Sequence, residues 1–200
     1  MAARQNAMSE LVRFWLEACR GCLMKESVPV PVPYNLSDID FVALRPDLQK
    51  FLLPTGEFVG PRLIVEAKDE HDFDPSGRDF GKRLREDLAA LGDGTFIPAA
   101  SAHKARFSML KQQHFEVARD LFTTEDFDRV FVVHALDDGI RREVAAALMQ
   151  KRIYWVTVRE LLRDLQSWYD QHKRPAGLRM TLVGDVFHLL FGYCNVRMPD

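Results

Sequence analysis

The chain has 200 residues, 47% of them hydrophobic, and its 27 basic side chains nearly balance 29 acidic ones. This composition excludes a disordered chain and fits one domain of ordinary size. With a net charge of −2 there is no positive field over the whole molecule, so nucleic-acid binding would need a local basic patch. Charged residues interrupt every apolar run and the start lacks a signal-peptide pattern, which predicts a cytoplasmic protein without membrane association.

The first part of the chain predicts a helix followed by three strands. Apolar residues at steps of three and four from Ser9 to Cys22 predict a helix. Prolines at every second position within 28–34 remove N–H donors along one edge only, which favours an edge strand. Apolar runs containing charged residues predict two further strands over 38–44 and 62–68, joined by a connection over 45–60.

The second part predicts alternating helices and strands. Helices are expected over 82–91, 102–122, 140–150 and 158–169, and strands over 129–134 and 153–156. Thr157 and Glu160 form a capping box at the start of the last of these helices. A strand, a helix and a strand in succession indicate a parallel pair, so the expected class is α/β, with a mixed sheet flanked by helices. We expect residues 1–172 to form one domain and 173–200 to form an apolar extension, either packed on that domain or in a dimer contact.

Three cysteines argue against a disulfide framework. Cys19 and Cys22 have the CxxC spacing of zinc ligands, but a zinc site would need two more ligands, for which Cys194 and His188 are the obvious pair. Because a helix precedes the CxxC motif, the two cysteines are interpreted as the end of that helix.

Three charged residues in the predicted strands indicate a functional site. Side chains alternate between the faces of a strand, so Glu66 and Lys68 share one face, and Asp38 and Asp40 share a face of the preceding strand. If these strands are neighbours in a suitable register, Asp40, Glu66 and Lys68 meet on one surface. The alternative is a pair of amphipathic strands whose acids cap turns or face water.

Two carboxylates and a lysine in one place suit phosphodiester hydrolysis. Magnesium prefers oxygen ligands and commonly takes one or two protein carboxylates together with phosphate oxygens, so Asp40 and Glu66 would hold Mg²⁺, with Mn²⁺ as a substitute. Lys68 would orient the attacking water or stabilise charge on the phosphate in the transition state. The sequence leaves open whether Lys68 acts as a base.

These residues resemble the PD-(D/E)XK nuclease superfamily over about Ser9 to Phe122. The phrase Asp38-Ile39-Asp40-Phe41-Val42-Ala43 is similar to the Glu-Ile-Asp-Leu-Ile-Ala form of some small members, in which the second acid is catalytic, although the strict Pro-Asp dipeptide is missing. The resemblance implies a restriction-endonuclease-like core of order αβββαβ, followed here by an additional strand and helix and a C-terminal helical segment. It also implies a metal-dependent endonuclease in which Asp40, Glu66 and Lys68 are catalytic.

The resemblance further implies a glutamate on the first helix as a catalytic and metal-binding residue. Glu10 matches best and Glu17 is the alternative; both could instead be solvated helix flank. Phosphate contacts are predicted for the basic residues of the following helices and for an adjacent glutamine, unless they too are merely solvated. These candidates are Lys82, Arg83, Lys104, Lys111 and Gln112.

DNA is therefore the expected partner and substrate, and two other classes of protein compete with the nuclease. The first is a non-catalytic nucleic-acid-binding or assembly module that retains the fold. The second is a doubly wound nucleotide-binding protein, which the absence of a Gly-rich turn between a first strand and a helix disfavours. A homodimer is also predicted, because cutting both strands often requires two active sites and the apolar stretch Phe187–Tyr193 could supply an interface.

Overall fold

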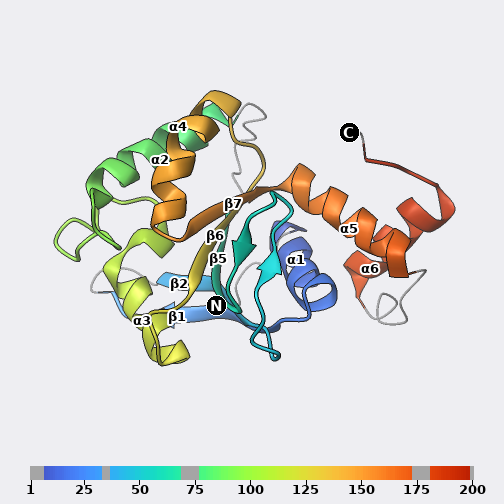
Figure 1. Cartoon of the computed structure of the whole chain (residues 1–200), viewed down its shortest axis with the longest axis horizontal. Coiled ribbons are helices and arrows are strands. Elements are labelled where there is room, and N and C mark those ends of the chain that lie inside the picture. The colour runs from blue at the N-terminus through green and yellow to red at the C-terminus, as the bar shows by residue number, and fades with distance from the viewer. Residues whose placement is uncertain (1–6, 33–36, 69–76, 173–180, 199–200) are drawn as a thin grey trace.

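In the computed structural model a five-stranded mixed β-sheet separates two layers of helices (Figure 1). The structure describes residues 7–32, 37–68, 77–172 and 181–198. The strand order is β1-β2-β5-β6-β7, with the first three strands antiparallel and the last three parallel. These strands are β1 (Leu23–Val30), β2 (Ser37–Leu44), β5 (Arg62–Lys68), β6 (Asp128–Val133) and β7 (Ile153–Thr157). The predicted α/β class, with a mixed sheet flanked by helices, is confirmed.

Each face of the sheet is covered by its own helices (Figure 1). One layer contains α2 (Arg78–Leu91), α3 (Gln112–Phe122) and α4 (Asp138–Gln150). The other contains α1 (Ala7–Phe14), α5 (Val158–His172) and α6 (Leu182–Phe187). Turns of π-helix extend α1 over Trp15–Cys19 and α6 over His188–Tyr193. Among the described helices, none has the length and apolar character needed to cross a bilayer.

The central strands are apolar on both faces because helices cover both. All six residues of β6 are buried, which matches the near-continuous apolar run expected of a parallel strand between two layers. Along β5, Ile64 packs toward α2, α3 and α4, whereas Leu63 and Val65 pack toward α1 and α5. Because side chains alternate along a strand, Glu66 and Lys68 face the same helices as Ile64.

One predicted strand and one predicted connection differ from the structure in their details. β1 is the edge strand that the prolines indicate, but it begins at Leu23 and ends at Val30, so it precedes most of the proline run. Pro29 is tolerated because β1 has a partner on one side only. The predicted connection over 45–60 contains a small hairpin of β3 (Phe51–Leu52) and β4 (Phe58–Val59).

The predicted helix over 102–122 is wrong in its first half. Residues 101–104 form turns, Ser108–Leu110 form a short 3₁₀ turn, and α3 begins only at Gln112. The backbone N–H groups of 106–109 donate to two buried carboxylates, Asp87 and Glu66, instead of to helix carbonyls. These tertiary hydrogen bonds satisfy the segment without a helix, while Phe107, Met109 and Leu110 pack into the core.

The capping box predicted at the start of α5 is present, and the C-terminal segment packs on the rest of the protein. Thr157 and Glu160 exchange the reciprocal hydrogen bonds of a capping box at the start of α5, as predicted. Phe187 and Phe191 are buried in the cluster that contains α1 and α5. Whether 173–200 is a unit separate from 1–172 stays a prediction, since 173–180 and 199–200 lie outside the described residues.

Candidate active site

The structure brings Asp40 and Glu66 together on one face of the sheet. β2 and β5 pair antiparallel with Phe41 opposite Val65, and the next step of this register places Asp40 opposite Glu66. The backbone N–H of Ala67 donates to Asp40 Oδ2 at 2.8 Å. Val42 follows Asp40 and Ile64 precedes Glu66 on the same face, and both pack under α2 and α3, so the acids also belong to that layer.

Glu66 is held by a turn that arrives from outside the sheet. Its side chain is only 6% exposed and forms an ion pair with Lys68 Nζ through Oε1. Oε1 also accepts from the N–H of Ser108 at 3.1 Å, and Oε2 accepts from the N–H of Met109 at 3.0 Å. These three contacts hold the Glu66 side chain between the end of β5 and the turn over 108–110.

Lys68 stands at the end of β5, between Glu66 and the ring of Phe107. Its side chain is part-exposed, and Nζ lies 5.6 Å from the centre of that ring. Burial alone would lower the pKa of Lys68, but the charges of Glu66 and Asp40 outweigh burial and raise that pKa above its ordinary value. Lys68 therefore keeps its proton at neutral pH, which suits a cation that orients or neutralises rather than a general base.

Asp40 has an unusual protonation equilibrium. Burial, reinforced by the negative charge of Glu66, raises the pKa of Asp40 to about 7 despite the hydrogen bond from Ala67 and the charge of Lys68. Two carboxylates that share a poorly solvated place cannot both ionise easily unless a cation joins them. Asp40 is thus the acid in this site whose charge is least compensated by the protein.

A cavity of about 10 Å³ lies beside the two acids, lined by residues of β2 and β5, the Ser108–Leu110 turn and His114 of α3. This volume is close to that of a single water-sized sphere. His114 is 1% exposed, and its Nε2 lies 2.9 Å from Ser37 Oγ. Burial lowers the pKa of His114, which favours a neutral ring.

Sequence reasoning missed four residues that shape this site: Asp87, Ser108, Met109 and His114. Asp87 is buried in α2 and accepts from the N–H groups of Arg106 and Phe107, both at 2.8 Å, which anchors the turn above Glu66. A buried position for Asp87 could have been suspected, because it falls three residues after Leu84 and four before Leu91 on one helix face. Backbone donors such as the N–H groups of Ser108 and Met109 leave no sequence signal.

The structure does not bring Glu10 to the other two acids. Glu10 lies on α1, in the layer on the opposite face of the sheet, and pairs with Arg13 at 3.0 Å. Glu17 is exposed in the following π-helical turn. Within the described ranges, no three His, Cys, Asp or Glu side chains are arranged as a group that could hold a metal ion. A third carboxylate ligand from this first helical segment stays a prediction.

The predicted phosphate-binding residues all lie in the layer that covers the two acids. Lys82 and Arg83 belong to α2, and Lys82 is exposed. Lys104 is exposed in the run of turns, not on the helix that the sequence predicted. Lys111 immediately precedes α3, and Gln112, its first residue, accepts from the N–H of Ala99 at 3.1 Å and donates to Glu116 at 2.8 Å. Gln112 therefore has a structural role whatever else it contacts.

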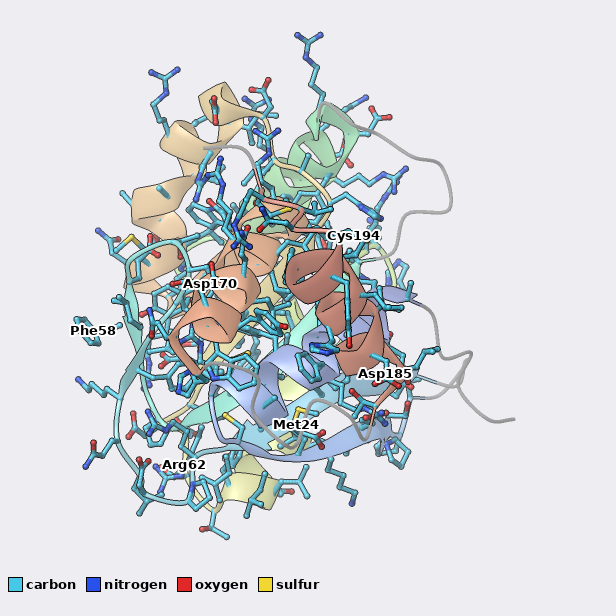
Figure 2. All side chains as sticks on the ribbon, turned by 90° about the vertical axis from the view of Figure 1, so that its right-hand side faces the viewer. Met24, Phe58, Arg62, Asp170, Asp185 and Cys194 are labelled. Atoms are coloured by element: carbon cyan, nitrogen blue, oxygen red, sulfur yellow. The ribbon has the colours of Figure 1, made fainter. Side chains whose placement is uncertain are left out.

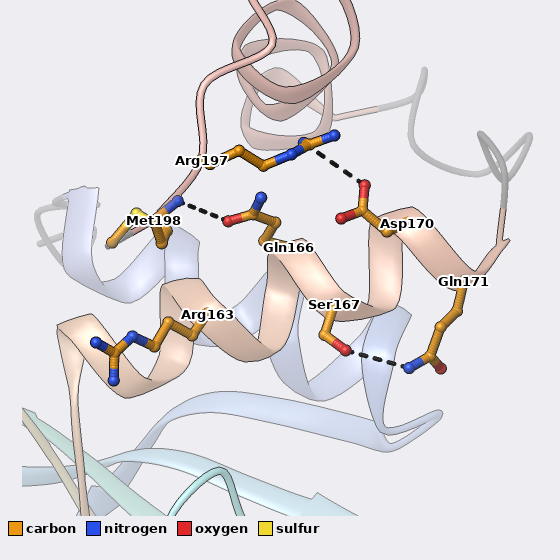
Figure 3. Close-up of a pocket in the computed structure, with 7 residues that line it drawn as sticks. All are labelled: Arg163, Gln166, Ser167, Asp170, Gln171, Arg197 and Met198. Carbon is orange, nitrogen blue, oxygen red and sulfur yellow. Dashed lines mark hydrogen bonds and ion pairs between the residues drawn. The ribbon is translucent and has the colours of Figure 1, made fainter. Parts of the chain in front are cut away.

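A larger hollow, of about 780 Å³, lies along α5 (Figure 3), in the layer on the other face of the sheet from these acids. Gln166 accepts from the N–H of Met198 at 2.8 Å, and Asp170 lies 3.7 Å from Arg197, so contacts between α5 and the chain end span it. It holds no cluster of acids, and we place the candidate active site at the small cavity because the ionisable groups converge there.

Comparisons with known proteins do not assign a family. No family model and no curated protein matches the chain. Among solved structures, the chain is similar to one from "Structure of EndoMS-dsDNA2 complex", with 8% identity and a TM-score of 0.29. That match covers 79% of this chain and 48% of the other, so this chain spans about half of that protein's length. A likeness this weak carries no argument about fold or activity.

Proposed function

We propose that this protein is a metal-dependent nuclease of the PD-(D/E)XK superfamily that hydrolyses phosphodiester bonds in DNA. The observation that carries the proposal is that Asp40 and Glu66, on two adjacent strands, line one small cavity, with Lys68 paired to Glu66 at the end of its strand. The register of the two strands supports the proposal, because it sets Asp40 opposite Glu66. DNA as the substrate rests on the resemblance in sequence and on the basic side chains of the covering layer.

The two acids fit a divalent cation by their chemistry. Oδ2 of Asp40 accepts one backbone N–H, and Oε2 of Glu66 accepts one, so each carboxylate retains lone pairs for a further partner. Bound there, Mg²⁺ would polarise the scissile phosphate and lower the pKa of a coordinated water. The carboxylic acid of Asp40, whose pKa is about 7, would lose its proton more readily beside such a cation.

The charge of Lys68 and the small size of the cavity indicate how a phosphate would be bound. The ammonium group of Lys68 stays charged, so it would orient the attacking water and offset negative charge as it develops on the phosphate. The cavity accommodates one water-sized group. A phosphate would therefore reach the acids with one oxygen, or after displacement of the Ser108–Leu110 turn.

A second candidate function is a non-catalytic binding or assembly module, and Glu66 favours it. Both oxygens of Glu66 accept backbone N–H groups from the same turn, and Lys68 completes its pairing. Such an acid could serve only to hold the turn against the sheet. In that function Asp40 and Lys68 would be structural partners of Glu66 and would have no role toward a phosphate.

Cleavage assays separate the two functions. Plasmid, single-stranded and branched DNA, together with RNA, are incubated with the protein in Mg²⁺, Mn²⁺ or EDTA. For a nuclease we expect metal-dependent cleavage that Asp40→Asn and Lys68→Ala each reduce by about 100-fold or more, the usual range for losing a ligand or an electrostatic contact in a catalytic site. Lys50→Ala, an exposed lysine between β2 and β3, is the control prepared in parallel and should retain activity.

Cleavage that persists in EDTA, or that survives both substitutions, would remove the nuclease proposal. DNA binding without metal-dependent cleavage, unchanged by Lys68→Ala, would support the non-catalytic module. Glu66→Gln is less informative in this assay, because it leaves Lys68 without its ion-pair partner and one buried N–H without an acceptor. A loss of about 1–3 kcal/mol of stability is expected from that change alone.

A further inference from the structure

The C-terminal helix, from Leu182 through the π-helical turn to Tyr193, is apolar on two opposite sides. Its inner side is anchored by Phe187 and Phe191, whose rings stack at 5.2 Å between centres. The ring centres of Phe187 and Phe14 are 5.9 Å apart, and those of Phe191 and Tyr169 are 6.0 Å apart. Thr181 caps the helix by accepting from the N–H of Gly184 at 3.0 Å. This side accounts for how the helix is attached to the molecule.

The outer side is exposed although it is also apolar. We call it the C-terminal stripe: Leu182, Val186, Leu189, Leu190, Tyr193 and Val196. Leu182 is 81% exposed and Tyr193 is 70% exposed. Asp185 and Cys194, on the same side of the molecule, are labelled in Figure 2. A surface helix ordinarily presents charged residues to water, whereas a helix that is apolar all round is normally covered by another element.

The charge and polarity of the C-terminal stripe indicate which class of partner could cover it. Between Leu182 and Val196 the chain carries one charged residue, Asp185, and no lysine or arginine. A nucleic acid or an anionic membrane surface would require basic residues around such a helix, so neither matches it. An apolar surface of low charge matches another apolar protein surface.

We propose that the C-terminal stripe pairs with the same stripe of a second copy of this chain, forming a twofold homodimer. The six residues are between 38% and 81% exposed, so a symmetric pair that covered them on both copies would bury at most on the order of 1,000 Å², near the lower end of specific protein interfaces. In a twofold pair the same patch serves both copies, so a continuous apolar stripe is complementary to itself. The candidate active site is in the layer on the other face of the sheet, so the pairing would not cover it in either copy.

Sedimentation velocity on the purified chain from about 1 to 50 µM tests the proposal, since an interface of this size commonly gives affinities in that range or tighter. We expect a concentration-dependent dimer. Leu189→Asp places two like charges in the apolar contact and should raise the dimer dissociation constant at least tenfold. Tyr193→Ser removes a ring from the end of the stripe and should also raise it.

The matched control is Phe58→Asp, which adds the same charge at an apolar side chain that is 66% exposed on the β3–β4 hairpin, away from the stripe (Figure 2). It should leave the dimer unchanged. Circular dichroism and the melting temperature, extrapolated to low concentration, verify that each variant folds. A wild-type chain that remains a monomer throughout the range would overturn the proposal. So would a dimer that both stripe variants leave intact, or one that Phe58→Asp weakens equally.

Discussion

At the scale of single residues, the two acids of the candidate site differ in how many donors and cations surround their carboxylates. Glu66 has two backbone donors and Lys68, whereas Asp40 has one backbone donor and the nearby charge of Glu66. The difference appears as a raised pKa for Asp40, to about 7. An acid that holds its proton near neutrality is the group in this site most sensitive to pH and to an added cation.

For the metal-free protein this predicts a loss of stability as the pH rises. Unfolded Asp has a pKa of about 3.9, and the folded value is about 7, so the folded state binds the proton more tightly. The contribution to stability is complete below about pH 4 and is lost as the pH rises through about 7. Its size is at most about 4 kcal/mol, from a shift of about three pKa units.

Asp40→Asn should remove most of this pH dependence, because an amide does not titrate. Urea unfolding in EDTA at about pH 5 and about pH 8 measures it, and the quantity of interest is the difference in slope between variant and wild type, since other groups also titrate. Asp93→Asn, at an exposed position after α2, is the control. Equal slopes for Asp40→Asn and wild type would contradict the prediction.

At the scale of elements, the layer above the site depends on the close approach of α2 and α4. Gly81 of α2 faces Ile140 of α4: a Cβ at position 81 would clash with Cδ1 of Ile140 and lie 2.8 Å from its Cγ2. Glycine therefore permits the helices to pack, and this contact is one of those that position α2, whose Asp87 anchors the turn over Glu66.

Gly81→Ala should destabilise the protein by up to about 2 kcal/mol. Alanine gains about 1 kcal/mol in helix propensity, but overpacking a buried contact costs about 1–3 kcal/mol, and Ile140 is buried with little room to yield. Thermal or urea unfolding measures the change. Ile140→Val removes the clashing Cδ1 and should recover part of the loss in the double variant. An alanine variant more stable than wild type would show that the helices can move apart.

At the scale of the whole molecule, the balance of charge means that the proposed binding of DNA would depend on local basic groups. The net charge is −2, so any attraction for phosphates must come from local groups such as the exposed Lys82 and Lys104. If both contact phosphates, each releases about one counterion from the DNA on binding.

The double variant Lys82→Gln and Lys104→Gln should therefore weaken DNA binding and reduce the slope of log affinity against log salt by about two. Fluorescence anisotropy with a short labelled duplex in EDTA, from about 50 to 200 mM KCl, measures both quantities without cleavage. Lys50→Gln, on the segment between β2 and β3, should leave the slope unchanged. An unaltered slope in the double variant would place the DNA elsewhere.

Apolar periodicity and side-chain alternation are local properties of the chain, so the α/β class, the edge position of the proline-bearing strand and the candidates Asp40, Glu66 and Lys68 could be predicted from the sequence. The register that sets Asp40 opposite Glu66 could not. Only the tertiary structure decided that residues 101–110 form turns, since Asp87 and Glu66 take the backbone donors that a helix would have used. It alone placed His114 at the cavity and Glu10 on the other face of the sheet. Hydrogen bonds and packing between residues distant in sequence have no local pattern, so these features could not be predicted from it.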